Sequence, residues 1–134
     1  MNVTGFWTGS YWHYQHGQPA VPFLANLDDK AGRLSGSISE PDLYLKTGTR
    51  LEALLIGYRE GKRVTFAKAY DGAGPFAHRV DYTGSLSDDG KTISGSWYLS
   101  GEWGAFQMSR ELLELEEPAE EQIDVPVLLE AELK

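Results

Sequence analysis

Six side chains that can bind ligands or exchange protons fall near one end of a series of predicted β-strands. They are Tyr11, His13, Glu40, Lys68, Tyr70 and His78. Two imidazoles, a carboxylate and an ammonium group can donate or accept hydrogen bonds, and a partly buried carboxylate or imidazole can titrate near neutral pH. Tyr82 and Trp97 are predicted beneath them, and Phe23 and Phe66 are the other rings expected to line the same space. This pattern is typical of a ligand pocket with a polar upper wall above an apolar floor.

The same residues allow two other interpretations. Glu40 and Lys68 could form a solvated ion pair at the rim, and the histidines could simply lie at the upper end of a packed barrel. Alternatively, Glu40 with His13 or His78 could perform acid–base chemistry, as in an isomerase-type enzyme built in a barrel mouth. In the pocket interpretation, Lys68 and the histidines favour a small ligand that is apolar in its body and has an anionic or hydrogen-bonding head.

Other kinds of reactive site are not visible in the sequence. There is no cysteine, which excludes disulfides, thiolate metal ligands and a cysteine nucleophile. His13 and His16 are three residues apart, but His16 belongs to a predicted loop, so the two are not a helical ligand pair. No serine-nucleophile motif occurs. We therefore expect neither a bound metal nor a cofactor.

Eight short runs of residues alternate with turn signals, which predicts eight β-strands. The chain contains 15 glycines, seven tyrosines, five phenylalanines and four tryptophans, a mixture typical of many short strands and tight turns. The predicted strands are 5–14, 21–28, 33–40, 50–59, 63–70, 78–87, 92–100 and 103–110. Because no link has room for a crossover helix, we expect an all-β fold, an eight-stranded antiparallel up-and-down barrel. The run Leu51–Leu55 would also suit a helix.

Alternation along the strands assigns their more apolar faces to the barrel interior. The predicted interior set is Trp7, Tyr11, His13, Phe23, Ala25, Leu27, Leu34, Ile38, Glu40, Val64, Phe66, Lys68, Tyr70, Val80, Tyr82, Leu86, Ile93, Trp97, Leu99, Phe106, Met108 and Arg110. Gly9, Gly36, Gly84 and Gly95 recur on the same faces, where an inward glycine lets a strand bend as the barrel closes. Because they carry no side chains, we also expect them to leave interior space, with the free volume in the upper half.

The links between strands differ in length at the two ends of the predicted barrel. Tight turns at 28–32, 60–61 and 88–90 share one end with the start of the chain. The other end holds the links 15–20, 41–48, 71–77 and 101–102, which are mostly long. Long loops around one rim and tight turns around the other predict an open mouth above a closed floor.

Gly5-Phe6-Trp7 on the first strand, together with Arg110 near the end of the last, resembles a motif of the calycins. This superfamily holds lipocalins, fatty-acid-binding proteins and avidins. The resemblance implies that the Trp7 indole packs at the barrel floor beneath Arg110. Within the superfamily, residues 4–110 look most like an avidin-type, streptavidin-like barrel, because the segments 4–7, 34–37, 82–84 and 93–99 follow in avidin-like order.

The chain departs from avidins at the positions that the resemblance assigns to biotin binding. Ile38 stands where a ring-binding tyrosine is implied, and Glu40 where a serine is implied. The further departures are His78 and Val80 for a Ser/Thr pair, Tyr82 for a tryptophan and Lys68 near another tryptophan position, while Trp97 is kept. Each unmatched buried polar group would cost about 1–3 kcal/mol, so we expect an avidin-like barrel that does not bind biotin.

The net charge of −8 arises in the C-terminal segment. Residues 111–134 hold nine acidic residues and one lysine, which leaves 11 residues of each sign in residues 1–110. We therefore divide the chain into a neutral barrel, 1–110, and an acidic tail, 111–134. Neither part has a basic patch suited to nucleic acid, and no apolar run reaches the roughly 20 residues of a membrane helix. Because residues 1–4 show neither a basic start nor an apolar run, we expect no signal peptide and a cytoplasmic protein.

Large aromatic residues are also predicted on the outside of the barrel. Outward-facing Trp12, Tyr14, Tyr98 and Trp103 lie on neighbouring strands towards the mouth. Such a surface is usually covered, here by apolar residues of the tail or by a second copy, so we expect a homo-oligomer. The leading functional hypothesis is a barrel that binds a small molecule. A protein-interaction or oligomerisation module with a packed interior is the alternative, and an isomerase-type enzyme is the third.

Overall fold

The computed structural model describes residues 2–14, 19–41, 49–70, 79–111, 128–129 and 131–132. Its main strands are β1 (Gly5–His13), β2 (Val21–Lys30), β3 (Arg33–Pro41), β4 (Arg50–Glu60), β5 (Arg63–Tyr70), β6 (Arg79–Leu86), β7 (Thr92–Leu99) and β8 (Glu102–Ser109). Two further strands of two residues each, β10 (Leu128–Leu129) and β11 (Ala131–Glu132), pair with each other. Most of the acidic tail lies outside the described residues, so the division at residue 110 stays a prediction. No helix that could cross a membrane occurs in the described part of the chain.

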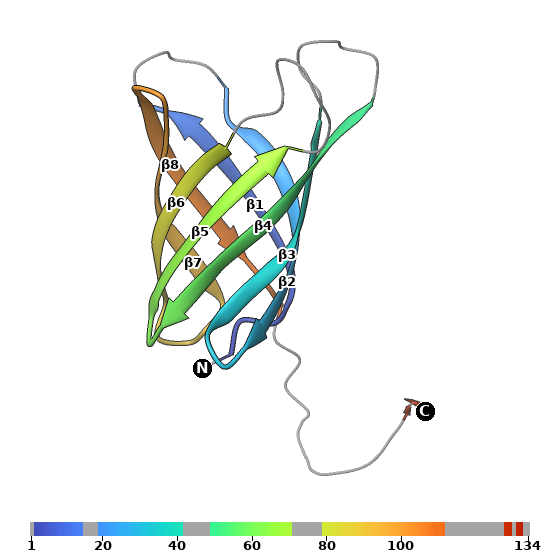
Figure 1. Ribbon diagram of the computed structural model, residues 1–134. Helices are drawn as coiled ribbons and strands as arrows, with labels where there is room; N and C mark the ends of the chain where they lie inside the picture. The colour runs from blue at the N-terminus through green and yellow to red at the C-terminus, as the bar shows by residue number, and fades with distance from the viewer. Residues whose placement is uncertain are drawn as a thin grey trace.

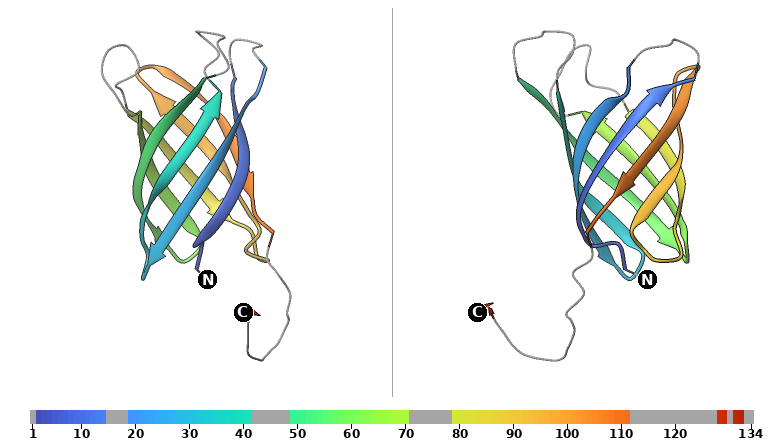
Figure 2. Two further views of the ribbon diagram at one scale, coloured as in Figure 1. Left: turned by 90° about the vertical axis from the view of Figure 1, so that its right-hand side faces the viewer. Right: turned by 180° about the vertical axis from the view of Figure 1, so that it is seen from behind.

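Strands β1 to β8 close into a barrel in which each strand is antiparallel to its neighbours (Figures 1 and 2). The closure is made by β1 and β8, which place Tyr11 opposite Phe106. This confirms the predicted eight-stranded up-and-down barrel, whose strand ends differ from the predicted ones by two residues at most. Residues 51–55 belong to β4, so the alternative of a helix there is wrong.

Alternating side chains of all eight strands meet in one core. The residues predicted to face inward are buried or half-buried, and β4 adds Ala53 and Leu55. Rings fill the middle of the core. Phe66 stacks on Tyr82 with the ring centroids 4.7 Å apart, and Phe106 meets both rings edge-on. Stacked and edge-on contacts are favourable arrangements for aromatic pairs, so this part of the interior is well packed.

The inward glycines mark places where neighbouring strands come too close for a side chain. A Cβ atom at Gly36 would collide with the Asn26 carbonyl oxygen, and one at Gly95 would collide with the backbone of β6. These approaches confirm that the glycines allow the barrel to bend. At the glycine positions themselves, neighbouring backbone and the Phe106 ring fill the space that a side chain would take, so these residues leave no room there. The location of free volume in the upper half of the barrel stays a prediction.

The barrel end that carries the N-terminus is closed around Trp7. The Trp7 indole is fully buried, donates a hydrogen bond to the Val3 carbonyl at 3.0 Å, and lies 4.7 Å from the centre of the Arg110 guanidinium. Arg110 donates in turn to the carbonyls of Asn2 and Thr4, at 2.7 and 2.8 Å. The N-terminal segment is thereby tied to the residue that follows the last strand.

Asp29 on β2 also stabilises this closed end. Its buried carboxylate accepts hydrogen bonds from the amides of Val3 and Gly32, at 3.0 and 2.8 Å. The Arg59 guanidinium donates to it as well, at 2.7 Å. Burial by itself would raise the pKa of Asp29, but these donors outweigh burial and lower the pKa below its ordinary value. The ionised carboxylate therefore stabilises the closed end.

Candidate functional site

The barrel end opposite the N-terminus gathers the polar side chains that the sequence singled out. Glu40 lies near the end of β3, Lys68 near the end of β5, and Tyr11 in the second half of β1. Because neighbouring strands run antiparallel, these three positions come to the same end of the barrel. The linking residues 15–18, 42–48 and 71–78 at this end lie outside the described part of the chain.

Glu40 and Lys68 form an ion pair inside the barrel. The Lys68 Nζ atom lies 3.0 Å from Glu40 Oε2, and Lys68 is 1% and Glu40 2% exposed. The interpretation of this pair as a solvated rim contact is therefore wrong. Taking two charges out of water costs several kcal/mol per ion, and attraction offsets that cost only when geometry is good and further hydrogen bonds are made.

Two tyrosines supply such hydrogen bonds to the carboxylate. The hydroxyls of Tyr11 and Tyr70 each donate to Glu40 Oε1 at 2.8 Å. Burial first, and then the neighbouring Tyr11 and Glu40, raise the pKa of Tyr70, so its hydroxyl stays protonated and remains a donor at neutral pH. Glu40 thus accepts hydrogen bonds from three side chains, of which one is cationic.

The Lys68 ammonium group is surrounded by aromatic faces. Its Nζ atom lies 4.6 Å from the ring centroid of Tyr11, 4.7 Å from that of Tyr70 and 5.4 Å from that of Tyr82. Cation–π attraction in a desolvated site is worth about 2 kcal/mol. Burial lowers the pKa of Lys68, although the Glu40 carboxylate acts in the opposite direction. This amine therefore loses its proton more easily than a lysine in water.

The Tyr82 hydroxyl lies in the same interior and has no hydrogen-bond partner among the described residues. Tyr82 is 2% exposed, and burial raises its pKa well above the ordinary value, so the hydroxyl is neutral. Within the described part of the chain, Lys68 makes one hydrogen bond, to Glu40, although an ammonium group has three donors. An unpaired buried hydroxyl costs about 1–3 kcal/mol and points to a water or ligand atom as its partner.

Trp97 and His13 form the wall beside this cluster. The Trp97 indole donates to a backbone carbonyl of β1 at 3.1 Å, which holds its ring in place. His13 and Tyr11 meet that ring edge-on, with centroids 4.7 and 6.0 Å away. His13 also contacts Glu102 at 3.2 Å, and Phe23 packs against Tyr11 with the ring centroids 6.5 Å apart.

The structure brings together the predicted pocket residues that it describes. Eight of the nine have side chains that face the barrel interior: Tyr11, His13, Phe23, Glu40, Phe66, Lys68, Tyr82 and Trp97. The ninth, His78, lies outside the described residues. Ligand binding by these side chains stays a prediction, whereas their common location inside the barrel is a structural fact.

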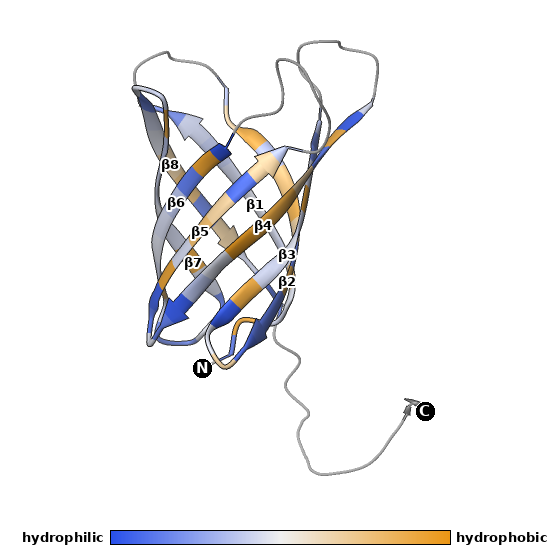
Figure 3. Cartoon of the chain, viewed as in Figure 1, coloured by the Kyte–Doolittle hydropathy of each residue, from blue (hydrophilic) through white to orange (hydrophobic). Residues whose placement is uncertain are grey.

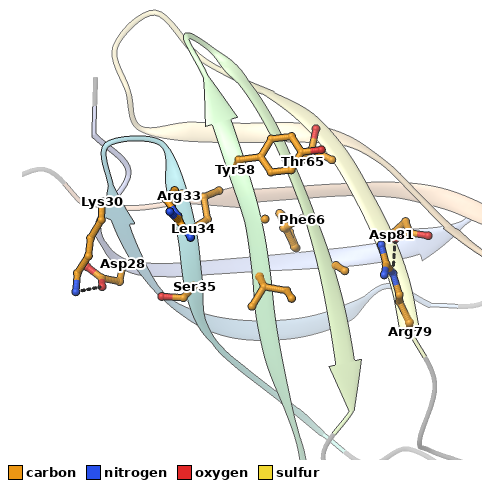
Figure 4. Close-up of a pocket in the computed structure, with 13 residues that line it drawn as sticks. Asp28, Lys30, Arg33, Leu34, Ser35, Tyr58, Thr65, Phe66, Arg79 and Asp81 are labelled. Carbon is orange, nitrogen blue, oxygen red and sulfur yellow. Dashed lines mark hydrogen bonds and ion pairs between the residues drawn. The ribbon is translucent and has the colours of Figure 1, made fainter.

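The outer face of β4 carries a hydrophobic stripe that was not predicted from the sequence. Leu54, Ile56 and Tyr58 point outward and are 65%, 66% and 62% exposed. Figure 3 shows β4 as hydrophobic over its middle. Ile56 and Tyr58 border a depression of about 760 Å³ that extends from Asp28 on β2 to Asp81 on β6 (Figure 4). The alternating pattern was hidden because residues 53–56 are all apolar, so neither face stood out.

The sequence matches no protein-family model, and no curated protein is significantly similar to it. Among the described residues, no three or more His, Cys, Asp or Glu side chains are arranged to hold a metal ion. The structure thus defines the fold, an eight-stranded antiparallel barrel consistent with a calycin-like architecture.

Proposed function

We propose that the protein is a calycin-like barrel of the avidin type that binds a small molecule inside its open end. The observation that carries this proposal is the pair of buried groups with unused hydrogen-bonding capacity, the Lys68 ammonium and the Tyr82 hydroxyl. A packed apolar interior would avoid the cost of an unpaired hydroxyl and of a buried charge. A ligand atom that accepts hydrogen bonds from these groups removes part of that cost.

The charges inside the barrel favour a neutral polar head on the ligand. Because Glu40 already neutralises Lys68, an anionic head would leave a net negative charge in a desolvated interior. A carbonyl oxygen needs only a donor, which Lys68 or Tyr82 can supply. The Trp97 ring, beside the polar cluster, then offers an apolar surface to the rest of the molecule. The proposed ligand is therefore flat and apolar with one neutral oxygen acceptor.

The test is a titration with flat neutral ketones, beginning with 2-acetylnaphthalene, followed by tryptophan fluorescence. We expect saturable binding that Tyr82→Phe weakens by about 2–12-fold, because one hydrogen bond is worth about 0.5–1.5 kcal/mol. The free energy of unfolding should be unchanged or higher in that variant, since the unpaired hydroxyl is gone. Leu54→Ser on the outer face is the matched control and should bind the ketone as the wild type does.

Two results would contradict the proposal. Tyr82→Phe could lose stability while no ketone binds either protein, which would make Tyr82 a structural residue. Nanomolar binding of biotin in calorimetry would contradict the proposed ligand class, because it would show an ordinary avidin pocket despite Ile38, Glu40 and Val80.

A second function, association through the outer wall, is favoured by a separate observation. Two groups of hydrophobic side chains are exposed there: Leu54, Ile56 and Tyr58 on β4, and Tyr14, Tyr98 and Trp103 around β1, β7 and β8. Monomeric proteins rarely expose large apolar patches, so we propose that a second copy of the chain covers one of them. Light scattering on the full chain, on Ile56→Asp and on a truncation after Arg110 tests this. A full-length monomer at every concentration contradicts it.

A further inference from the structure

Lys68 has the surroundings of a reactive amine. It lies inside the barrel, 3.0 Å from a carboxylate oxygen that can accept its proton, and its other two donors have no hydrogen-bond partner among the described residues. We infer that Lys68 captures aldehydes covalently, as an iminium ion on Nζ. The inference rests on the proposed function, because an aldehyde must enter the same interior as any other ligand.

Glu40 is placed to take the proton that Lys68 must lose before it can react. A lysine attacks a carbonyl only as the neutral amine, and an exposed lysine is almost fully protonated at neutral pH. In a desolvated pair, transfer of one proton from Lys68 to Glu40 Oε2 removes both charges together and leaves no isolated ion. Burial, which lowers the pKa of Lys68, acts in the same direction.

The reaction balances within the pair. Nζ gives a proton to Glu40 Oε2, its lone pair forms a bond to the aldehyde carbon, and the carbonyl oxygen takes that proton from Glu40. A second proton then passes from nitrogen to the new hydroxyl by way of Glu40, the C–O bond breaks, and water leaves. The net change converts an ammonium group and an aldehyde into an iminium ion and water, with no gain or loss of protons or electrons.

The product suits the site because the iminium ion keeps the single positive charge of Lys68. The Glu40 carboxylate, supported by the Tyr11 and Tyr70 hydroxyls, faces that charge as it faces the ammonium group. The aromatic faces around Nζ attract either cation. Exclusion of water from the interior slows hydrolysis back to the aldehyde. Aromatic or conjugated aldehydes are the favoured class, because the flat rings of the interior can stack on them.

The test is reductive trapping on the full-length protein. The protein is incubated with cinnamaldehyde and sodium cyanoborohydride, and the adducts are located by peptide mass spectrometry. We expect the Lys68 adduct to form at least about tenfold faster than adducts on the exposed Lys30 and Lys62, because Lys68 is the desolvated amine. Lys68→Arg should abolish the fast adduct.

Cinnamyl alcohol is the matched ligand without a reactive carbon, and its binding is followed by tryptophan fluorescence. If the alcohol binds while Lys68 is labelled no faster than Lys30, the covalent inference is overturned and the proposed function stands. If the alcohol does not bind and Lys68 is not labelled, both are overturned. The comparison of Lys68 with Lys30 is made within the wild-type protein, so it holds even where a variant fails to fold.

Discussion

Removing one member of the Glu40–Lys68 pair should cost more stability than removing both. In Glu40→Gln, the Lys68 ammonium loses the carboxylate 3.0 Å away and stays buried among ring faces. Breaking a buried ion pair in this way costs about 3–5 kcal/mol. Lys68→Met leaves a buried carboxylate that still has the hydroxyls of Tyr11 and Tyr70 as donors, so we expect its cost near the lower end, about 3 kcal/mol.

The double variant Glu40→Gln/Lys68→Met tests whether the two charges depend on each other. Replacing both members of a buried pair by neutral residues of similar volume is often neutral or stabilising, by about 1–4 kcal/mol. The glutamine oxygen can still accept hydrogen bonds from the tyrosines, and methionine fills the space of the lysine stem. The losses in free energy of unfolding of the two single variants should therefore add up to more than the loss of the double variant. We expect a coupling energy of about 3 kcal/mol or more.

Urea unfolding followed by tryptophan fluorescence measures the four free energies of unfolding. The exposed pair Arg79–Asp81, at 2.8 Å with side chains 70% and 54% exposed, is the matched control. Its coupling should stay below about 1 kcal/mol, because solvent screens an exposed pair. A coupling at Glu40–Lys68 as small as that of the control would refute the reasoning, since it would mean that the two groups are solvated or unpaired in solution.

Three further predictions concern the framework of the barrel. Trp7→Ala should lower the free energy of unfolding by about 3–5 kcal/mol in denaturant, and a loss below about 1 kcal/mol would show that Trp7 is not buried. Asp29→Asn should flatten the acid dependence of stability, with the exposed Asp28→Asn as control. Because folding lowers the pKa of Asp29, its contribution to the free energy of unfolding is present above the unfolded pKa of about 3.9 and is lost as pH falls through the folded pKa. An unchanged dependence of stability on acid pH in Asp29→Asn would contradict this. Gly36→Ala should unfold the barrel or strongly lower its melting temperature, because the new Cβ has no space, whereas the neighbouring outward Ser37→Ala should melt close to the wild type.

The fold could be predicted because its signals are local. Alternation with a period of two and glycine-containing turns mark strands without knowledge of their partners. The signals fail in β4, because both faces are apolar over residues 53–56 and the same residues are also compatible with a helix. Only pairing with β3 and β5 shows that Leu55 faces the core and Leu54 the solvent.

The site could be predicted in part. The alternation of side chains along each strand was enough to place Glu40 and Lys68 inside the barrel near one end. Their burial and their pairing depend on the register of three strands and on the rings that cover them, which a single sequence does not specify. The unpaired hydroxyl of Tyr82 could not be predicted either, because the lack of a partner is a property of the whole surroundings.

Native mass spectrometry of freshly purified protein tests most directly whether the interior is a ligand site. We expect a fraction of the wild-type protein to carry an additional small molecule that is lost on unfolding, and we expect that fraction to fall in Tyr82→Phe. The bare chain mass in every preparation, identical for the wild type and Tyr82→Phe, would contradict a ligand-binding interior.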